Sequence, residues 1–259
     1  MLFMLDNDKK MLANNMIPLR DGDFPFECHA GVACYTFCCR NVNLTLYPYD
    51  VIRLKKALNI DSEEFMRKHT FLQREHNQFF PSVKLKLRTD DKKSCPFLKE
   101  NGCSVYMDRP SACRTYPLEV AVASEKKDSA VEEYFFLTNH SYCLGHREAK
   151  RQTVKQWTRS QKLHDFNLMN SLWAEVDALF ASNPWKGEGV GGEKQKIAFM
   201  VCYNIDSFKE FILLHKLIQQ FRIEKSTKKM ILSEESELLK FGFEWLKLIL
   251  TGKSSLVKR

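Results

Sequence analysis

The stretch that decides the fold is residues 27–41, which read ECHAGVACYTFCCRN. It places four cysteines close together, Cys28, Cys34, Cys38 and Cys39. Aromatic residues precede and separate them, so we expect the thiols to lie in a partly apolar shell. This grouping is the first sign of a site built from sulfur ligands.

A second group of cysteines follows further along the chain. Cys95, Cys103 and Cys113 fall within a short segment, and Cys143 closes the series. Of the nine cysteines, only Cys202 lies outside this region, and we interpret it as a buried helix thiol. Unrelated buried thiols would be scattered over the chain, because free cysteine serves as a small core residue anywhere.

Metal binding is favoured over a disulfide framework. The N-terminus is apolar for five residues and then meets Asp6 and Asp8, without the basic start and long apolar centre of a secretion signal. In a reducing compartment a dense cysteine set is typical of metal or redox sites. We therefore predict a cytoplasmic metal-binding protein.

Composition and charge exclude several other classes. The 259 residues are 44% hydrophobic and 28% charged, which is ordinary for a globular protein and excludes a disordered chain. No apolar run reaches the roughly 18–20 residues of a membrane helix, so we expect no membrane partner. The net charge of +8 arises mainly in residues 149–259, where basic residues are spread out rather than clustered with aromatics. We interpret them as a solvated surface and expect no nucleic-acid partner.

The sequence pattern changes from cysteine-rich to helix-like near residue 148. We expect residues 1–23 to be an N-terminal lead-in and residues 24–148 to be a cysteine-cluster metal-binding domain. Residues 149–259 are expected to form a helical C-terminal region with a break near 183–192. The predicted fold class is α+β, a small cysteine-rich metal-binding domain followed by a mainly α-helical region.

Local patterns predict elements in the N-terminal part. A helix is expected over residues 49–58, and Asp61 begins another that continues to Phe71. Alternation of apolar and basic residues predicts a half-buried strand over 83–88. Two β-prone runs, 116–123 and 130–137, predict a hairpin.

The C-terminal part has helical patterns. Thr153 and Ser207 each open a capping box. The Ser207 helix is expected to bury a stripe of Phe211, Leu214, Ile218 and Phe221. A last helix is expected from near Ser233 to Ile249.

Thiolates suit zinc, copper(I) and iron–sulfur clusters. Four thiolates complete a tetrahedral zinc site or a [4Fe–4S] cluster, so eight could fill two sites, or one with cysteines to spare. Side chains of neighbouring residues diverge, so Cys38 and Cys39 favour two centres, or one ligand beside one supporting thiol. The candidate metal ligands are Cys28, Cys34, Cys38, Cys39, Cys95, Cys103, Cys113 and Cys143.

Other residues beside the cysteines have supporting roles. Guanidinium groups would offset the negative charge of a thiolate centre, and Arg40, Arg109 and Arg114 are placed for this. Arg109 could equally be a turn residue paired with Asp108. We interpret the histidines near the cysteines as surface or supporting residues rather than ligands: His29, His140 and His146.

The order and spacing of these residues resemble the YkgJ family, a zinc- or iron-chelating domain whose first run of cysteines ends in a Cys-Cys pair. The resemblance covers about residues 24–170, and the helical tail is similar to longer bacterial members. The matching positions are Phe26-x-Cys28, Cys34-x3-Cys38-Cys39-Arg40, Asp50-x2-Arg53-Leu54, Cys95-Pro96-Phe97-Leu98, Cys103-x2-Tyr106-x2-Arg109-Pro110, Cys113-Arg114-x-Tyr116-Pro117, Cys143-x-Gly145 and Thr153-Val154-x2-Trp157.

The resemblance implies an iron–sulfur cluster, with [4Fe–4S] favoured, or zinc, in a structural or redox role. One related branch, flagellin lysine-N-methylase, is a cluster-containing enzyme, and it implies protein-lysine methyl transfer as an alternative. A further alternative is an adaptor that zinc folds and whose basic helical tail binds a partner. Partners would be a protein substrate or a redox protein, and whether the chain is an enzyme stays open.

Overall fold

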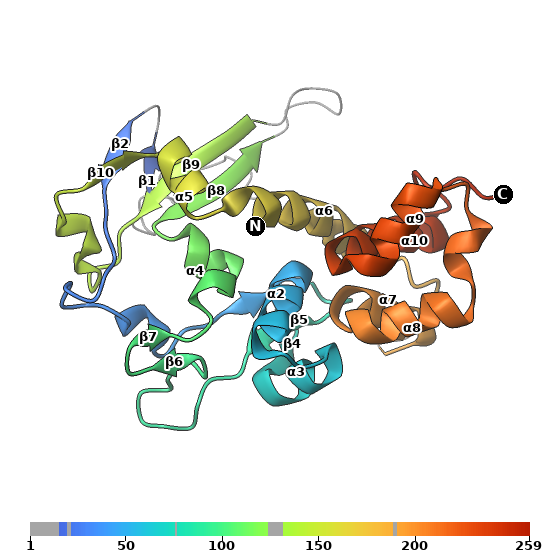
Figure 1. Ribbon diagram of the computed structural model, residues 1–259, viewed down its shortest axis with the longest axis horizontal. Helices are drawn as coiled ribbons and strands as arrows, with labels where there is room; N and C mark the ends of the chain where they lie inside the picture. Colours follow the sequence, from blue (N-terminus) through green and yellow to red (C-terminus); the bar gives the residue numbers. More distant parts are fainter. Residues whose placement is uncertain (1–15, 20–21, 76, 124–131, 189–190) are drawn as a thin grey trace. The chain divides into compact units, whose positions relative to one another are not determined.

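The computed structural model describes residues 16–19, 22–75, 77–123, 132–188 and 191–259 (Figure 1). The chain divides into two compact units. The first comprises residues 1–42, 88–106 and 111–165, and the second comprises 43–87, 107–110 and 166–259. Small sheets dominate the first unit and helices the second, so the predicted α+β class with a cysteine-rich part and a helical C-terminal region is confirmed.

The sheets of the first unit are short and antiparallel. The hairpin predicted from the two β-prone runs is confirmed, although its turn lies outside the described residues. Within the expected lead-in, two segments are strands that pair with later parts of this unit. The pairings are β1 (Met16–Leu19) with β9 (Glu132–Thr138), β9 with β8 (Leu118–Ala123), β2 (Asp23–Pro25) with β10 (Arg151–Thr153), and β6 (Leu98–Lys99) with β7 (Gly102–Cys103).

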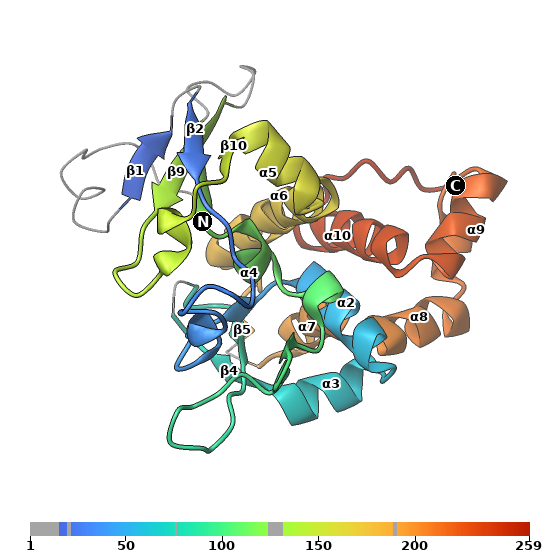
Figure 2. The same ribbon diagram turned by 60° about the vertical axis from the view of Figure 1, so that its left-hand side comes forward.

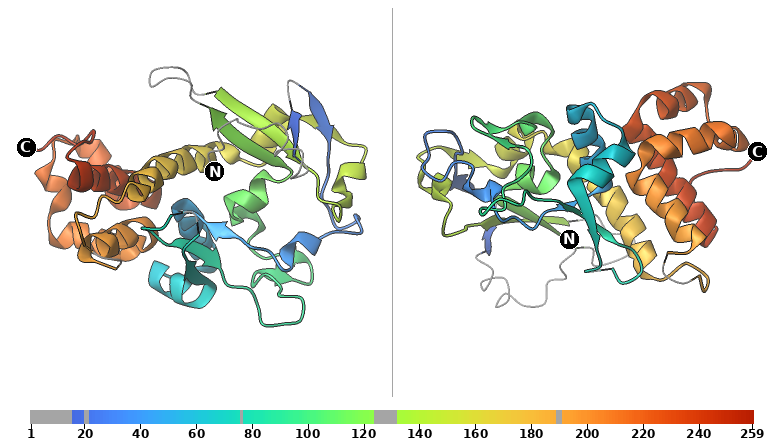
Figure 3. Two further views of the ribbon diagram at one scale, coloured as in Figure 1. Left: turned by 180° about the vertical axis from the view of Figure 1, so that it is seen from behind. Right: turned by 90° about the horizontal axis from the view of Figure 1, so that it is seen from below.

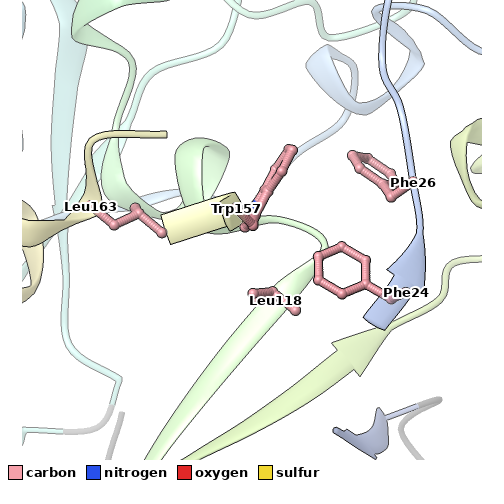
Figure 4. Close-up of a cluster of buried hydrophobic side chains, with 5 residues drawn as sticks. All are labelled: Phe24, Phe26, Leu118, Trp157 and Leu163. Atoms are coloured by element: carbon pink, nitrogen blue, oxygen red, sulfur yellow. The ribbon is translucent and has the colours of Figure 1, made fainter. Parts of the chain in front are cut away.

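A small aromatic core holds the first unit together (Figure 4). It consists of Phe24, Phe26, Leu118, Trp157 and Leu163, all at most 8% exposed. Phe26 meets the Trp157 ring edge-on at 5.4 Å, and the indole N–H donates to the Thr115 carbonyl at 3.0 Å. These contacts tie the β2 end to α5 (Val154–Ser160), the helix that the Thr153 capping box begins as predicted.

The remaining elements of the first unit are single turns of helix. They lie next to cysteines and set the path of the backbone there. They are η1 (Phe37–Cys39), α4 (Ser111–Thr115) and η3 (Leu144–Arg147). A further turn, η2 (Tyr106–Asp108), begins at Tyr106, the last residue of the segment 88–106 of this unit.

The second unit contains one small sheet, in the order β3-β5-β4. Its strands are β3 (Thr45–Leu46), β4 (Thr70–Gln73) and β5 (Ser82–Leu85). Two helices lie between β3 and β4 in sequence, α2 (Pro48–Leu58) and α3 (Ser62–His69), and they confirm the predicted helix over 49–58 and the Asp61 cap. Asp61 accepts a hydrogen bond from the Glu64 amide at 2.7 Å.

Helices form the rest of the second unit. In Figures 2 and 3, α7 to α10 lie together, coloured orange to red, and α10 contacts α2, α7, α8 and α9. Buried Lys55 on α2 pairs with Asp206, at 3.1 Å, and with Glu235, which links three of these helices. The helices are α6 (Leu163–Ala181), α7 (Glu193–Tyr203), α8 (Ile205–Leu214), η4 (Leu217–Gln220), α9 (Lys225–Ser233) and α10 (Glu235–Thr251).

Two predictions in the N-terminal part are wrong in detail. The helix begun by Asp61 does not continue to Phe71, because residues 70–73 pair as β4 with β5. Lys84 was expected on a solvated face, yet it is 3% exposed and pairs with Glu75 at 2.5 Å and Thr45 at 2.8 Å. Pairing with β5 accounts for the first difference, and the Glu75 carboxylate and the Thr45 hydroxyl, which bind the Lys84 ammonium, account for the second.

The helical stripe predicted after Ser207 is confirmed in the burial of Ile218 and Phe221 and is wrong at Leu214. The cap is Asn204, whose side chain accepts from the Ser207 amide at 3.3 Å, so α8 begins earlier than expected. Leu214 is 78% exposed, and Lys216 turns the backbone with a φ of 48°. The chain therefore leaves the helix before the expected stripe is complete. In the described residues, no helix has the length and apolar character needed to cross a membrane.

Candidate metal centre

All eight clustered cysteines lie in the first unit, whereas Cys202 lies in α7 of the second unit and is 2% exposed. Cys28 follows β2, and Cys38 and Cys39 lie in η1. Cys103 is in β7, Cys113 in α4, and Cys143 immediately precedes η3. The eight residues are partly or fully exposed rather than buried in a core. The fold therefore gathers cysteines that the sequence keeps more than a hundred positions apart.

A tight turn brings the first cysteines back toward one another. The Phe37 amide donates to the Cys34 carbonyl at 2.9 Å, and the Cys39 amide donates to the Thr36 carbonyl at 3.0 Å. Thr36 has a φ of 63°, in the left-handed region, which permits this reversal. Arg40 Nη1 holds the same Thr36 carbonyl at 3.0 Å.

Backbone pairing places the second group beside this turn. The Cys95 amide donates to the Cys39 carbonyl at 2.8 Å, next to the bridge between Arg40 and Ser94. Cys103 pairs with Leu98 across the β6–β7 hairpin, and the Leu98 amide donates to the Cys95 carbonyl at 3.1 Å. Three cysteines from two distant segments thus share one small framework.

The thiols of this framework act on one another electrostatically. The hydrogen bond with Cys38, burial, and the charges of Cys38, Cys95 and Cys113 raise the pKa of Cys39 above the ordinary thiol range. The hydrogen bond from Cys39, helped by Arg40, lowers the pKa of Cys38. The two neighbouring thiols are therefore coupled, and Cys38 ionises more readily than Cys39.

Cys34 and Cys143 make a second close contact. The Leu144 amide donates to Cys34 Sγ at 3.1 Å, and the nearby Cys34 thiol contributes to raising the pKa of Cys143. Burial raises the pKa of Cys143, while hydrogen bonds from the Tyr116 hydroxyl and the Gly145 amide lower it. Sequence reasoning gave Tyr116 no role at this site, and the signal was its position three residues after Cys113.

Backbone amides converge on several of the sulfurs. Cys95 Sγ accepts from the Phe97 and Leu98 amides, Cys34 Sγ from Leu144, and Cys143 Sγ from Gly145. Such N–H donors stabilise a thiolate and fix its direction, and they are typical surroundings of a ligated sulfur. The local backbone is therefore suited to thiolate ligands.

The predicted supporting residues divide between the two units. Arg40 acts on Cys38, and the buried Arg114 donates to the Gln161 carbonyl at 2.7 Å. Arg109 belongs to the second unit, and its neighbour Asp108 pairs with Arg53.

The histidines contact groups other than sulfur. His140 stacks on Tyr116 at 5.5 Å, and His146 Nε2 lies 3.2 Å from the Tyr116 hydroxyl. His29 Nε2 lies 3.7 Å from Glu148. Its Nδ1 accepts from the Gly31 amide at 3.1 Å, so the neutral ring carries its proton on Nε2.

The spacing of the sulfurs is wide. In the described residues, the one group of three metal-ligand atoms within 4.8 Å of one another is Glu27, His29 and Glu148. All eight cysteines are described, and no three of their Sγ atoms meet that spacing. His29 Nε2 lies 3.7 Å from Glu148 Oε2, and this group contains none of the clustered cysteines.

A cavity of about 500 Å³ opens beside Cys28. Its apolar wall comes from Phe26, Tyr106 and Trp157, and glutamine side chains and Lys150 add polar groups. A volume of this size falls in the range that accommodates small molecules. Cys28 is therefore a candidate ligand beside a space that a small molecule could enter.

The match to known proteins is confined to the cysteine region. A family model named CxxCxxCC, described as a putative zinc- or iron-chelating domain, matches residues 27–144. This segment contains all eight clustered cysteines. Searches of curated proteins and of solved structures gave no match.

Proposed function

We propose that the segment 27–144, which matches the model of a zinc- or iron-chelating cysteine-cluster domain, holds an iron–sulfur cluster. The proposed ligands are drawn from the eight clustered cysteines, with [4Fe–4S] as the favoured type. When bound, such a cluster supplies one-electron transfer or cross-links the loops that ligate it. A reducing compartment, the cytoplasm, suits a site of this kind.

One observation carries the choice of a cluster over a single zinc ion. Zn–S bonds of about 2.3 Å place the sulfurs of a tetrahedral site about 3.8 Å apart. No three of the eight Sγ atoms lie within 4.8 Å of one another. A cluster accepts a wider arrangement, because each thiolate binds a different iron.

The donors around the sulfurs support the same proposal. Cys34, Cys95 and Cys143 each accept at least one backbone N–H, and Arg40 adds positive charge beside Cys38. These groups offset the negative charge of a thiolate-ligated cluster. Eight cysteines leave room for two centres, or for one centre with spare thiols.

The test is metal analysis of the full chain purified without oxygen, together with its visible absorption. We expect about four irons per cluster and a brown protein. Cys95→Ser should lower the iron content, because this sulfur accepts two backbone amides beside Cys39. Cys202→Ser, in the second unit, is the matched control and should keep the iron content per folded chain unchanged.

Other results would redirect the proposal. One or two zinc ions in a colourless protein would overturn the iron–sulfur cluster and favour a zinc-folded adaptor with a basic partner-binding tail. Equal iron content in Cys95→Ser and Cys202→Ser would overturn the ligand assignment. Wild-type protein with no bound metal would overturn both.

The cavity beside Cys28 supports one alternative function. A small molecule there would lie next to a proposed metal ligand, as a cluster-dependent protein-lysine methyltransferase requires for its methyl donor. Calorimetric titration of the metal-loaded chain with S-adenosylmethionine tests this alternative. Saturable binding would favour the enzyme, and no heat of binding would favour the structural or redox role.

A further inference from the structure

Two exposed aromatic side chains lie next to cysteines of the first unit and contact each other. Phe37 lies in η1 immediately before Cys38, and Tyr142 immediately precedes Cys143. Their ring centroids lie 5.1 Å apart, although Phe37 is 51% exposed and Tyr142 is 40% exposed. This aromatic pair, Phe37 and Tyr142, therefore joins η1 to the Cys143 segment (residues 142–147) outside the hydrophobic core.

Two hydrogen bonds align the same parts of the chain. The Leu144 amide donates to Cys34 Sγ at 3.1 Å, and the Glu27 amide donates to the Gly145 carbonyl at 3.1 Å. Together with the ring contact, positions 142, 144 and 145 meet positions 37, 34 and 27 in that order. The two stretches thus lie side by side in opposite directions, and this places Cys143 beside the first group of cysteines.

The two rings of the aromatic pair differ in what holds them. Tyr142 stacks on His140 at 5.0 Å, and His140 stacks on Tyr116 at 5.5 Å. Tyr116 in turn meets Phe26 of the aromatic core edge-on at 5.6 Å, so a series of ring contacts connects Tyr142 to the core. Phe37 has no such support, because none of the three residues of η1 is buried. Tyr142 therefore offers a fixed surface on which η1 packs through Phe37.

A ring contact of this kind changes a local equilibrium. The free energy of an aromatic pair corresponds to about 2–10-fold in an equilibrium constant. Segments outside the core open locally at low free-energy cost. A ligand that needs the closed arrangement binds more weakly in proportion to the fraction of chains that are open. A contact that keeps two ligand-bearing segments together thus favours a metal that binds both.

Resting on the proposed metal centre, we propose that Phe37 and Tyr142 are positioning residues, whose ring contact holds η1 against the Cys143 segment. The contact keeps the thiols of both segments close before metal binds, and it opposes the separation of the segments through which metal is lost. Neither ring has to touch the metal for this role, because each acts through the cysteine that follows it in sequence.

The experiment follows metal loss from the full chain, purified with its metal in the absence of oxygen and then transferred into EDTA. Phe37→Ala removes the contact, and we expect it to lose metal about 2–10-fold faster than wild type. Tyr142→Ala should also lose metal faster, whereas Tyr142→Phe keeps the ring and should match wild type. Because both rings lie outside the core, the variants should keep the circular dichroism spectrum of the wild type.

Phe71→Ala is the matched control for the loss of an exposed ring. Phe71 is 48% exposed and lies in β4 of the second unit, which contains none of the eight clustered cysteines. Its rate of metal loss should equal that of wild type. An equal acceleration in Phe71→Ala and Phe37→Ala would overturn the proposal, because the effect would then not depend on the contact between the two segments.

A double-mutant cycle tests whether the two rings act through each other. If they do, Phe37→Ala combined with Tyr142→Ala loses metal more slowly than the product of the two single accelerations, because both substitutions remove the same contact. A double variant that reaches this product would overturn the proposal. If Phe37→Ala does not fold, Tyr142→Ala is compared with Tyr142→Phe, and equal rates of metal loss overturn the proposal.

The outcomes also separate this proposal from the metal centre on which it rests. A wild-type chain that binds no metal overturns both. A wild-type chain that binds metal, with Phe37→Ala retaining it equally long, overturns only the role of the aromatic pair.

Discussion

Glu244 accepts an unusual number of hydrogen bonds for a side chain on a helix surface. Its Oε2 accepts from the Ser255 amide at 2.8 Å and from the hydroxyls of Ser255 and Ser254 at 2.6 and 3.0 Å, and Lys247 donates to Oε1 at 2.9 Å. Burial raises the pKa of Glu244, but the bonds from Ser255, Lys247 and Ser254 outweigh it and lower the pKa to about 2. The carboxylate thus fastens the C-terminal segment to α10.

The depressed pKa predicts a pH-dependent contribution to stability. The contribution is fully present above the unfolded pKa of about 4.5 and is lost as pH falls through about 2. Glu244→Gln should lower the free energy of unfolding by about 1–3 kcal/mol at pH 7. The difference from wild type should shrink between pH 4.5 and pH 2 in urea titrations.

Exposed Glu193 gives the control for this prediction. Its side chain is 79% exposed and pairs only with the next turn, at Lys196, so Glu193→Gln should leave the free energy of unfolding nearly unchanged. A loss in Glu244→Gln that is the same at pH 7 and pH 2 would contradict the electrostatic account.

Single residues also differ in how well the sequence predicts their place at the candidate site. The eight cysteines and Arg40 can be proposed as site residues from type and spacing alone, because few other chemistries use thiols at that density. The contact between Tyr116 and His146, at 3.2 Å, could not be predicted, because it joins residues 30 positions apart.

At the scale of elements, α10 depends on one glycine. A Cβ at Gly242 would lie 2.6 Å from Val201 Cγ1 on α7 and 2.9 Å from Phe208 Cε1 on α8. The absent side chain therefore allows three helices to approach closely, as overpacking at such a contact would force them apart.

Gly242→Ala should lower stability by about 1–3 kcal/mol, because overpacking outweighs the better helix propensity of alanine. Thermal unfolding measures the change, and Val201→Ala in the same chain should recover part of the lost Tm by making room. A higher Tm in Gly242→Ala would contradict the close contact, since helix propensity alone predicts that result.

Two element predictions that rest on local signals are confirmed, whereas the capping box expected at Ser207 is not, because Asn204 is the cap. The Thr153 capping box and the Asp61 cap depend on neighbours three residues apart, and both helices begin as predicted. The end of α3 at His69 depends instead on pairing of β4 with β5, which lies beyond a connecting stretch of chain. The path of the chain after α8 depends on the left-handed backbone of Lys216, which no sequence pattern predicted.

At the scale of the whole chain, segments that follow one another in sequence do not always belong to the same compact unit. Residues 43–87 separate the two cysteine groups in sequence, yet they belong to the second unit, while both cysteine groups belong to the first. Hydrophobic periodicity predicts elements but not which of them pack together. The fold class could be predicted, and the assembly of the cysteine unit from three segments could not.

The proposal of a cluster requires that several metal ions share the cysteines of one unit. X-ray absorption at the metal edge of the full chain, purified without oxygen, tests it most directly. We predict an iron edge with a shell of sulfur neighbours and a shell of neighbouring irons. A zinc edge with sulfur at about 2.3 Å and no metal–metal shell would contradict the proposal.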